Sequence, residues 1–228
     1  MDGGLWRTGV QKQPTLLGIT SEVFALFNNE MWVKFLKDIV NLASHGYKYY
    51  CRADIPEEKA HKVESVFKKL SERYQCGLSK DQKYRRKKKG LANYEIKRWE
   101  RHIIVMRTEG KELDPCGDIW FSLEKKPYDL SVGPHLRLYV GKAPTGRKFT
   151  VYLARNTYRW LREILREDII YDRDSEFKKH LSWISDLPAF SGICHQMKEL
   201  RKYLNNFARS NRYRLKVPVL RLKNINRQ

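Results

Sequence analysis

The first regular pattern of apolar and polar residues lies in residues 21–43. Apolar side chains recur there every three or four positions, which places them on one face of an amphipathic α-helix. Residues 46–56 instead alternate and are rich in Tyr, so they are predicted to form a β-strand that ends at Pro56. Residues 57–74 return to helical spacing and carry acidic residues in the first turn, where the helix dipole favours negative charge. The chain is therefore predicted to begin with a helix, a strand and a second helix.

Four further strands and three helices are predicted to follow. Residues 94–110 are long enough for one extended strand that ends at a Glu-Gly turn. Three shorter strand candidates come next, DIWFSLEKK, HLRLYVG and KFTVYLAR. The apolar spacing then becomes helical over three segments, residues 156–170, 175–185 and 193–209. This order of elements predicts an α+β fold with a mostly antiparallel sheet packed on the N-terminal and central helices.

The predicted elements divide the chain into four parts. An N-terminal extension, residues 1–20, precedes an α+β domain over residues 21–155, in which residues 79–93 are predicted to form a basic loop. A helical C-terminal lobe occupies residues 156–209, and a basic tail follows over the last residues, 210–228.

Most of the positive charge is concentrated in two segments. The formal net charge is +20, far above what solubility requires. Residues 80–101 hold ten Lys and Arg against three Asp and Glu, and residues 198–228 hold ten against one, so the two segments together carry +16. Because clustered cations attract polyanions, nucleic acid, either RNA or DNA, is the predicted partner.

The two basic segments are expected to act as two clamps on one phosphate backbone. In the second segment, cations and Asn205 fall on the helix face opposite the apolar residues, as a backbone-tracking helix requires. The predicted phosphate contacts are Lys80, Lys83, Arg85, Arg86, Lys87, Lys88, Lys89, Arg98, Arg101, Lys198, Arg201, Lys202, Arg209, Arg212 and Arg214. A solvated charge run without a partner, a nuclear-localisation signal and a ribosome-like adhesive role are the alternatives.

The predicted strands have one apolar face and one face that carries aromatic and cationic side chains. If the second face is open, single-stranded bases could stack on it, each contributing about 1 to 3 kcal/mol. The predicted stacking residues are Tyr50, Trp120, Tyr139 and Tyr152. In the alternative, the C-terminal helices cover this face and the tyrosine hydroxyls find partners inside the protein.

The first basic segment also resembles part of a known group of proteins. The residues that carry the resemblance are Ser79, Lys80, Arg85, Arg86, Lys87, Gly90, Leu91, Ala92, Asn93, Tyr94, Arg98, Arg101, Thr108, Glu109 and Gly110. This stretch of about thirty residues is similar to one in uncharacterised basic proteins of bacterial mobile and plasmid-rich genomes. The resemblance implies a bacterial mobile-element context and implies no activity.

Patterns that would support catalysis are sparse. A rolling-circle nuclease needs a His-hydrophobic-His metal pair on a strand, whereas His102 and His135 are each solitary. Asp118 and Glu124 would lie roughly 20 Å apart in one extended strand, too far to share a metal ion. A glycine-rich phosphate loop is absent from the sequence. A binding protein without catalytic residues, metal or cofactor is therefore predicted. The alternative is a metal-dependent nuclease or strand-transfer enzyme of a mobile element, whose acidic residues, including Asp114, assemble only in three dimensions.

The remaining features bear on location and on protein partners. The four cysteines are isolated, so they are predicted to be reduced thiols. No apolar run approaches the roughly 20 residues that span a bilayer, and residues 1–14 lack a signal-peptide pattern. A cytoplasmic protein without a membrane partner is predicted, or a nuclear one if the host has a nucleus. Subunits of a nucleoprotein complex are a further expected class of partner, with Trp32 and Phe35 of the first helix as either core or interface residues.

Overall fold

The computed structural model describes residues 30–112, 117–132, 136–143, 146, 148–213 and 217–224. These residues form an α+β fold with two antiparallel sheets, which confirms the predicted class. The predicted extension, residues 1–20, and the first part of the predicted N-terminal helix lie outside the described residues.

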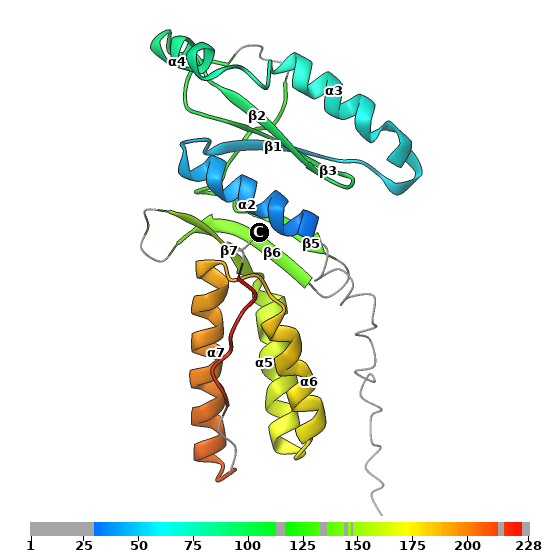
Figure 1. Ribbon diagram of the computed structural model, residues 1–228, viewed down its shortest axis with the longest axis vertical. Helices are drawn as coiled ribbons and strands as arrows, with labels where there is room; N and C mark the ends of the chain where they lie inside the picture. Colours follow the sequence, from blue (N-terminus) through cyan, green and yellow to red (C-terminus); the bar gives the residue numbers. More distant parts are fainter. Residues whose placement is uncertain are drawn as a thin grey trace, which may run out of the picture.

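The helices and strands occur in a mixed order along the chain (Figure 1). The helices are α2 (Glu30–Ser44), α3 (Val63–Arg73), α4 (Lys80–Lys88), α5 (Arg155–Ile170), α6 (Asp174–Ser185) and α7 (Ser191–Ser210), with a 3-10 helix, η1 (Glu57–Lys62), before α3. The strands are β1 (Tyr49–Asp54), β2 (Tyr94–Trp99), β3 (His102–Arg107), β4 (Phe121–Ser122), β5 (Tyr128–Val132), β6 (Leu136–Lys142) and β7 (Phe149–Leu153). The first sheet has the order β2-β3-β1-β4, and the second has the order β5-β6-β7.

Helix α2 lies between the two sheets and contacts β2 on one side and β6 and β7 on the other (Figure 1). Its side chains Trp32, Phe35, Leu36 and Ile39 are buried in the main core. Their helical spacing is the pattern that predicted this helix. Trp32 and Phe35 are therefore core residues.

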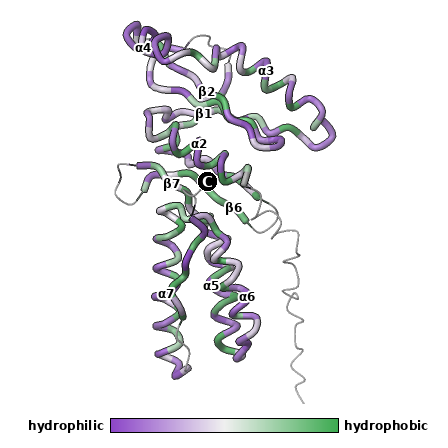
Figure 2. Tube along the Cα trace, in the orientation of Figure 1, coloured by the Kyte–Doolittle hydropathy of each residue, from purple (hydrophilic) through white to green (hydrophobic). Residues whose placement is uncertain are grey.

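The opposite face of the first sheet is covered by α3 and the residues that follow it. Tyr74, Ala92, Tyr94 and Val105 form a second, smaller core there. Figure 2 shows apolar residues in the strands and along the other helices, whereas α4 at the end of the molecule is hydrophilic. Both faces of this sheet are thus at least partly covered, which limits the surface on which a ligand could lie.

Helices α5, α6 and α7 form a lobe beyond the second sheet (Figure 1). The first turn of α7 packs closely on β7, since a Cβ atom added at Gly192 would lie 2.4 Å from the carbonyl oxygen of Val151 and 2.8 Å from the ring of Tyr152. Only glycine fits at this position without a shift of the backbone.

We expect Gly192→Ala to lower the free energy of unfolding by about 1 to 3 kcal/mol, the usual cost of overpacking. Ala would favour the helical conformation by about 1 kcal/mol, but its methyl group would meet a backbone oxygen, which cannot move aside as a side chain can. Urea denaturation measures the change, with Asn206→Ala at an exposed position of α7 as the control. An unchanged or higher midpoint for Gly192→Ala would show that α7 does not approach β7 this closely.

Three predicted elements were wrong in detail. Residues 94–110 form a hairpin of β2 and β3, whose turn contains Glu100 at a positive φ of 47°. The candidate DIWFSLEKK contains only the two-residue strand β4, and β5 lies in a segment that was not among the strand candidates. The strands form two sheets because β5 pairs with β6 and leaves β4 on the first sheet.

Within the described part of the chain, no helix is both long enough and apolar enough to cross a membrane.

Candidate nucleic-acid interface

The basic run that was predicted to be a loop over residues 79–93 forms helix α4, so that prediction was wrong. Ser79 caps the helix: its hydroxyl accepts a hydrogen bond from the Gln82 amide at 3.3 Å, and the Gln82 side chain accepts one from the Ser79 amide at 2.9 Å. This reciprocal arrangement is a capping box, and its Ser-x-x-Gln signature is visible in the sequence. The cations at the other end lie near the negative pole of the helix dipole, which offsets part of their mutual repulsion.

Two of the predicted phosphate contacts instead hold α4 on the sheet. The Lys83 ammonium group forms an ion pair with Glu95 of β2, and this hydrogen bond raises the pKa of Lys83. The Lys83 carbonyl accepts a hydrogen bond from Asn93 at 3.0 Å. The Arg86 guanidinium group lies 5.5 Å from the ring centroid of Tyr94, and its nitrogen atoms are buried. Lys83 and Arg86 are therefore anchors of the helix.

The other cations of α4 point to solvent. This α4 cationic face consists of Lys80, Arg85, Lys87, Lys88 and Lys89, all exposed. None of them forms an ion pair with another described residue. Tyr84 lies among them with 59% of its surface exposed, and the Lys88 ammonium group lies 5.0 Å from its ring centroid. The face is at one end of the molecule, where a long polyanion can approach without meeting the rest of the fold (Figure 1).

The predicted contacts on the hairpin are occupied within the protein. Arg98 pairs with Glu64 of α3 and lies 5.3 Å from the ring centroid of Phe67. Arg101 donates a hydrogen bond to the Ile55 carbonyl at 3.1 Å. At about 3.4 Å per residue along a strand, both lie well away from the end of β2 on which α4 rests. They fasten η1 and α3 to the hairpin.

The predicted second clamp on α7 is covered in part by the chain itself. Arg201 Nε donates a hydrogen bond to the Val217 carbonyl at 3.2 Å, and the Asn205 side chain accepts one from the Val217 amide at 3.0 Å. Val217 is fully buried, and Lys223 forms two backbone hydrogen bonds with the connection between α6 and α7. The predicted roles of Arg201 and Asn205 on a free helix face were therefore wrong.

Some predicted contacts of this second clamp are exposed. Lys198, Lys202, Arg209 and Arg212 have exposed side chains. Arg214 lies outside the described residues. The exposed cations are thus spread along α7 and its end, whereas four of those on α4 lie within residues 85–89.

The predicted stacking surface on the sheets is mostly closed. Tyr50 is 2% exposed, and its hydroxyl donates a hydrogen bond to the Pro127 carbonyl at 3.3 Å, so its predicted role in base stacking was wrong. Trp120 is half-buried and packs against Tyr74 and Tyr94, with the Arg107 guanidinium group 5.0 Å from its ring centroid.

Tyr139 and Tyr152 form a stacked pair on the second sheet. Their ring centroids lie 5.0 Å apart with an interplanar angle of 17°, and burial raises the pKa of both hydroxyl groups. The Tyr152 hydroxyl donates a hydrogen bond to the Lys142 carbonyl at 2.9 Å, and Gly192 of α7 lies against the ring. Here the C-terminal helices cover part of the face, as the alternative supposed.

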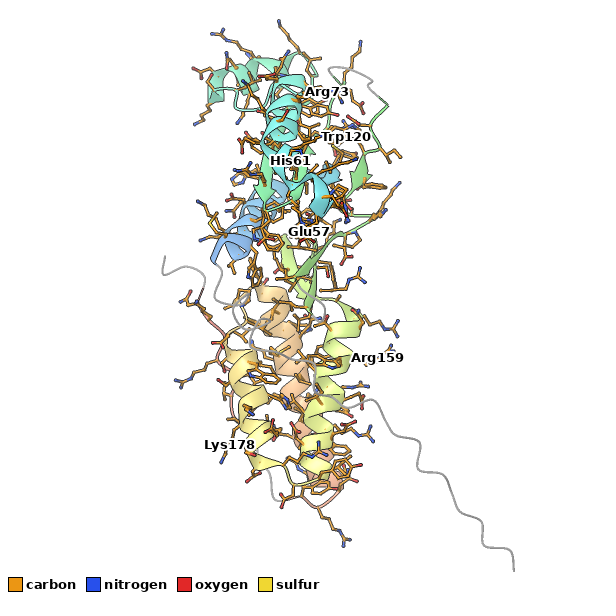
Figure 3. All side chains as sticks on the ribbon, turned by 90° about the vertical axis from the view of Figure 1, so that its right-hand side faces the viewer. Glu57, His61, Arg73, Trp120, Arg159 and Lys178 are labelled. Carbon is orange, nitrogen blue, oxygen red and sulfur yellow. The ribbon has the colours of Figure 1, made fainter. Side chains whose placement is uncertain are left out.

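The acidic residues considered for a metal site bind different partners. Asp118 accepts from the Tyr74 hydroxyl and lies 3.5 Å from Arg73, whereas Glu124 pairs with Lys142 at 3.2 Å. Figure 3 shows Arg73 and Trp120 on the same side of the first sheet. Among the described residues, no three His, Cys, Asp or Glu side chains come together as metal ligands would. Asp114 and His135 lie outside them.

A row of arginines on α5 was not among the predicted contacts. Arg155, Arg159, Arg162 and Arg166 recur at helical spacing along one face. The sequence contains this signal, because positions i, i+4, i+7 and i+11 share a helix face. The charge pattern did not predict this row of arginines, because Glu163, Glu167 and Asp168 on the same helix keep the local net charge low.

Comparison with known proteins provides no family for this chain. No protein-family model matches it, and neither the curated proteins nor the solved structures contain a match.

Proposed function

We propose that this protein binds nucleic acid, RNA or DNA, by gripping the phosphate backbone with the α4 cationic face. The observation that supports this is a set of five exposed cations on α4 and its C-cap, four of them within residues 85–89, without an ion pair in the described part of the chain. They stand on a capped helix that two further cations anchor to the sheet. The helix holds the cations in place, so less conformational freedom is lost when phosphates bind.

The charge distribution of α4 is unfavourable for the isolated protein. Arg85 lies one helical turn from Lys88 and Lys89, and like charges at this spacing destabilise a helix by about 0.2 to 0.5 kcal/mol per pair. Phosphate groups would relieve this repulsion and release counterions from the nucleic acid. The closely spaced cations of α4 do not stabilise the isolated protein, and a polyanionic ligand would account for their presence.

The setting of this activity forms part of the proposal. The similarity of residues 79–110 to basic proteins of mobile and plasmid-rich genomes supports a bacterial mobile-element or ribonucleoprotein context in the cytoplasm. Protein subunits of such a complex are proposed as further partners.

Titration of labelled duplex and single-stranded DNA and RNA against salt tests the proposal. With about five phosphates neutralised by α4, the logarithm of the association constant should fall with the logarithm of salt concentration with a slope near −4 to −5 for a duplex. Fluorescence anisotropy at several salt concentrations gives this slope. Undetectable binding at low salt, or an affinity that hardly changes with salt, would contradict the proposal. Parallel incubation with Mg²⁺ or Mn²⁺ shows whether any of the nucleic acids is cleaved.

A further inference from the structure

A second surface of mixed cationic and aromatic character lies where α5 runs beside α7. This α5–α7 edge consists of Arg155, Arg159, Arg162 and Arg166 on α5, Tyr203 and Phe207 on α7, and Tyr213 just beyond α7. The four arginines span a rise of about 16 Å along the helix. Figure 3 shows Arg159 pointing to solvent, on the other side of the lobe from Lys178.

The aromatic rings of the edge form a ladder. Tyr203 and Phe207 have ring centroids 6.3 Å apart and planes within 19°, and Phe207 and Tyr213 have centroids 6.3 Å apart and planes within 25°. The guanidinium group of Arg162 lies 5.0 Å from the Tyr203 ring, and that of Arg166 lies 5.3 Å from the Phe207 ring. Tyr213 is 36% exposed at the end of the ladder.

Acidic groups hold part of the arginine row in place. The Glu163 carboxylate accepts hydrogen bonds from Arg162 at 2.9 Å and from Arg166 at 3.0 Å. Burial raises the pKa of the Tyr158 hydroxyl at the same edge, while the nearby Arg162 lowers it and Glu199 of α7 raises it. Arg155 and Arg159 are exposed and form no ion pair with any residue that the structure describes. The row therefore has two fixed arginines beside the rings and two that are available to an anion.

We propose that the α5–α7 edge is a second nucleic-acid site, specific for single strands. Arg155 and Arg159 bind phosphates through their planar, bidentate donors. Unpaired bases stack at the aromatic ladder, beginning at Tyr213. A duplex keeps its base faces inside the stack, so it can use only the arginines of this edge.

Neither the α4 cationic face nor the sheets combine available arginines with a ladder of aromatic rings in this way. The α4 face offers many cations with Tyr84 alone as an exposed ring, and the rings of the sheets are buried, as Tyr50 is, or partly covered by other parts of the protein, as Trp120, Tyr139 and Tyr152 are. The structure thus places the aromatic and cationic surface expected for single strands in the helical lobe. The inference is independent of α4, because it rests on different residues at a different place in the fold (Figure 1).

Two variants test this site with fluorescence anisotropy. The probes are an oligothymidylate of about 20 nucleotides, which stays single-stranded, and a duplex of about 20 base pairs. Arg155→Gln/Arg159→Gln should reduce oligothymidylate affinity by about tenfold, since two charge-assisted contacts are removed. Tyr213→Ala should reduce it by about fivefold to 100-fold through lost stacking. Tyr213→Ala should change duplex affinity by less than about threefold, and the arginine variant should lower duplex affinity by less than it lowers oligothymidylate affinity.

The control variant Lys178→Gln/Lys179→Gln removes the same charge from exposed positions of α6. Thermal unfolding of all variants identifies any loss of affinity that comes from misfolding. The arginine variant is altered only at exposed positions, so it still tests the proposal if Tyr213→Ala fails to fold. The proposal is overturned if the arginine variant binds oligothymidylate as tightly as the control, or if it loses duplex binding equally. Loss of duplex binding in an α4 variant tests the proposed function separately, so the two can fail independently.

Discussion

Replacing Arg85, Lys87, Lys88 and Lys89 by Gln is expected to reduce duplex affinity at physiological salt by about 10²- to 10³-fold. Each of these cations that neutralises a phosphate contributes about 0.9 to the slope of log affinity against log salt. The variant should therefore also have a slope that is flatter by about three to four. Lys83 and Arg86 stay unchanged because they hold α4 on the sheet.

The stability of this variant should be close to that of the parent protein. The four side chains are exposed and form no ion pair with other described residues, and substitutions of this kind usually change the free energy of unfolding by less than about 0.5 kcal/mol. Removing their mutual repulsion favours the helix slightly.

A matched control separates the place of the charges from their number. Lys59 and Lys62 of η1 and Lys178 and Lys179 of α6 are exposed cations away from α4. Changing these four to Gln lowers the net charge by the same amount. If this control loses affinity and slope as strongly as the α4 variant, then net charge alone drives binding and the α4 cationic face has no special role.

Asp168→Ala is expected to lower the free energy of unfolding by at least about 3 kcal/mol, the usual cost of breaking a buried pair. The Asp168 side chain on α5 is almost fully buried and lies 2.5 Å from His180 Nδ1 on α6. The rings of His180 and Trp183 also form a T-shaped contact, with ring centroids 4.3 Å apart. Without the carboxylate, Nδ1 of the largely buried His180 side chain loses its partner, and an unpaired polar group is costly where water has little access.

Thermal unfolding should show this as a melting temperature lower by about 6 to 12 °C for a chain of this size. Glu167→Ala, at the neighbouring position of α5, serves as the control, since Glu167 forms no ion pair in the described part of the chain. In the double variant Asp168→Ala/His180→Ala the losses should be less than additive, because both changes remove the same contact. Additive losses would show that the pair does not bind α5 to α6.

The sequence by itself determined the elements whose pattern is local. Helices α5, α6 and α7 and strands β6 and β7 were predicted close to their observed bounds, and so was the C-terminal end of α2. Their apolar residues repeat with the period of the element, and that period depends only on neighbouring positions along the chain. The hairpin of β2 and β3 could not be predicted in this way, because its turn at Glu100 contains neither Gly nor Pro. The pairing of β5 with β6 in a separate sheet depends on contacts that no local pattern specifies.

For the candidate interface, the sequence located the concentration of charge, and only the tertiary structure decided which cations are available. Charge density is a property of composition, so the segment that contains α4 could be recognised before its conformation was known. The partners of Lys83, Arg98 and Arg201 are Glu95, Glu64 and the Val217 carbonyl, each of which is brought close by folding. Hydrogen bonds and ion pairs act over a few ångströms. The three-dimensional positions of these partners therefore decide which cations bind within the protein and which are available to a ligand.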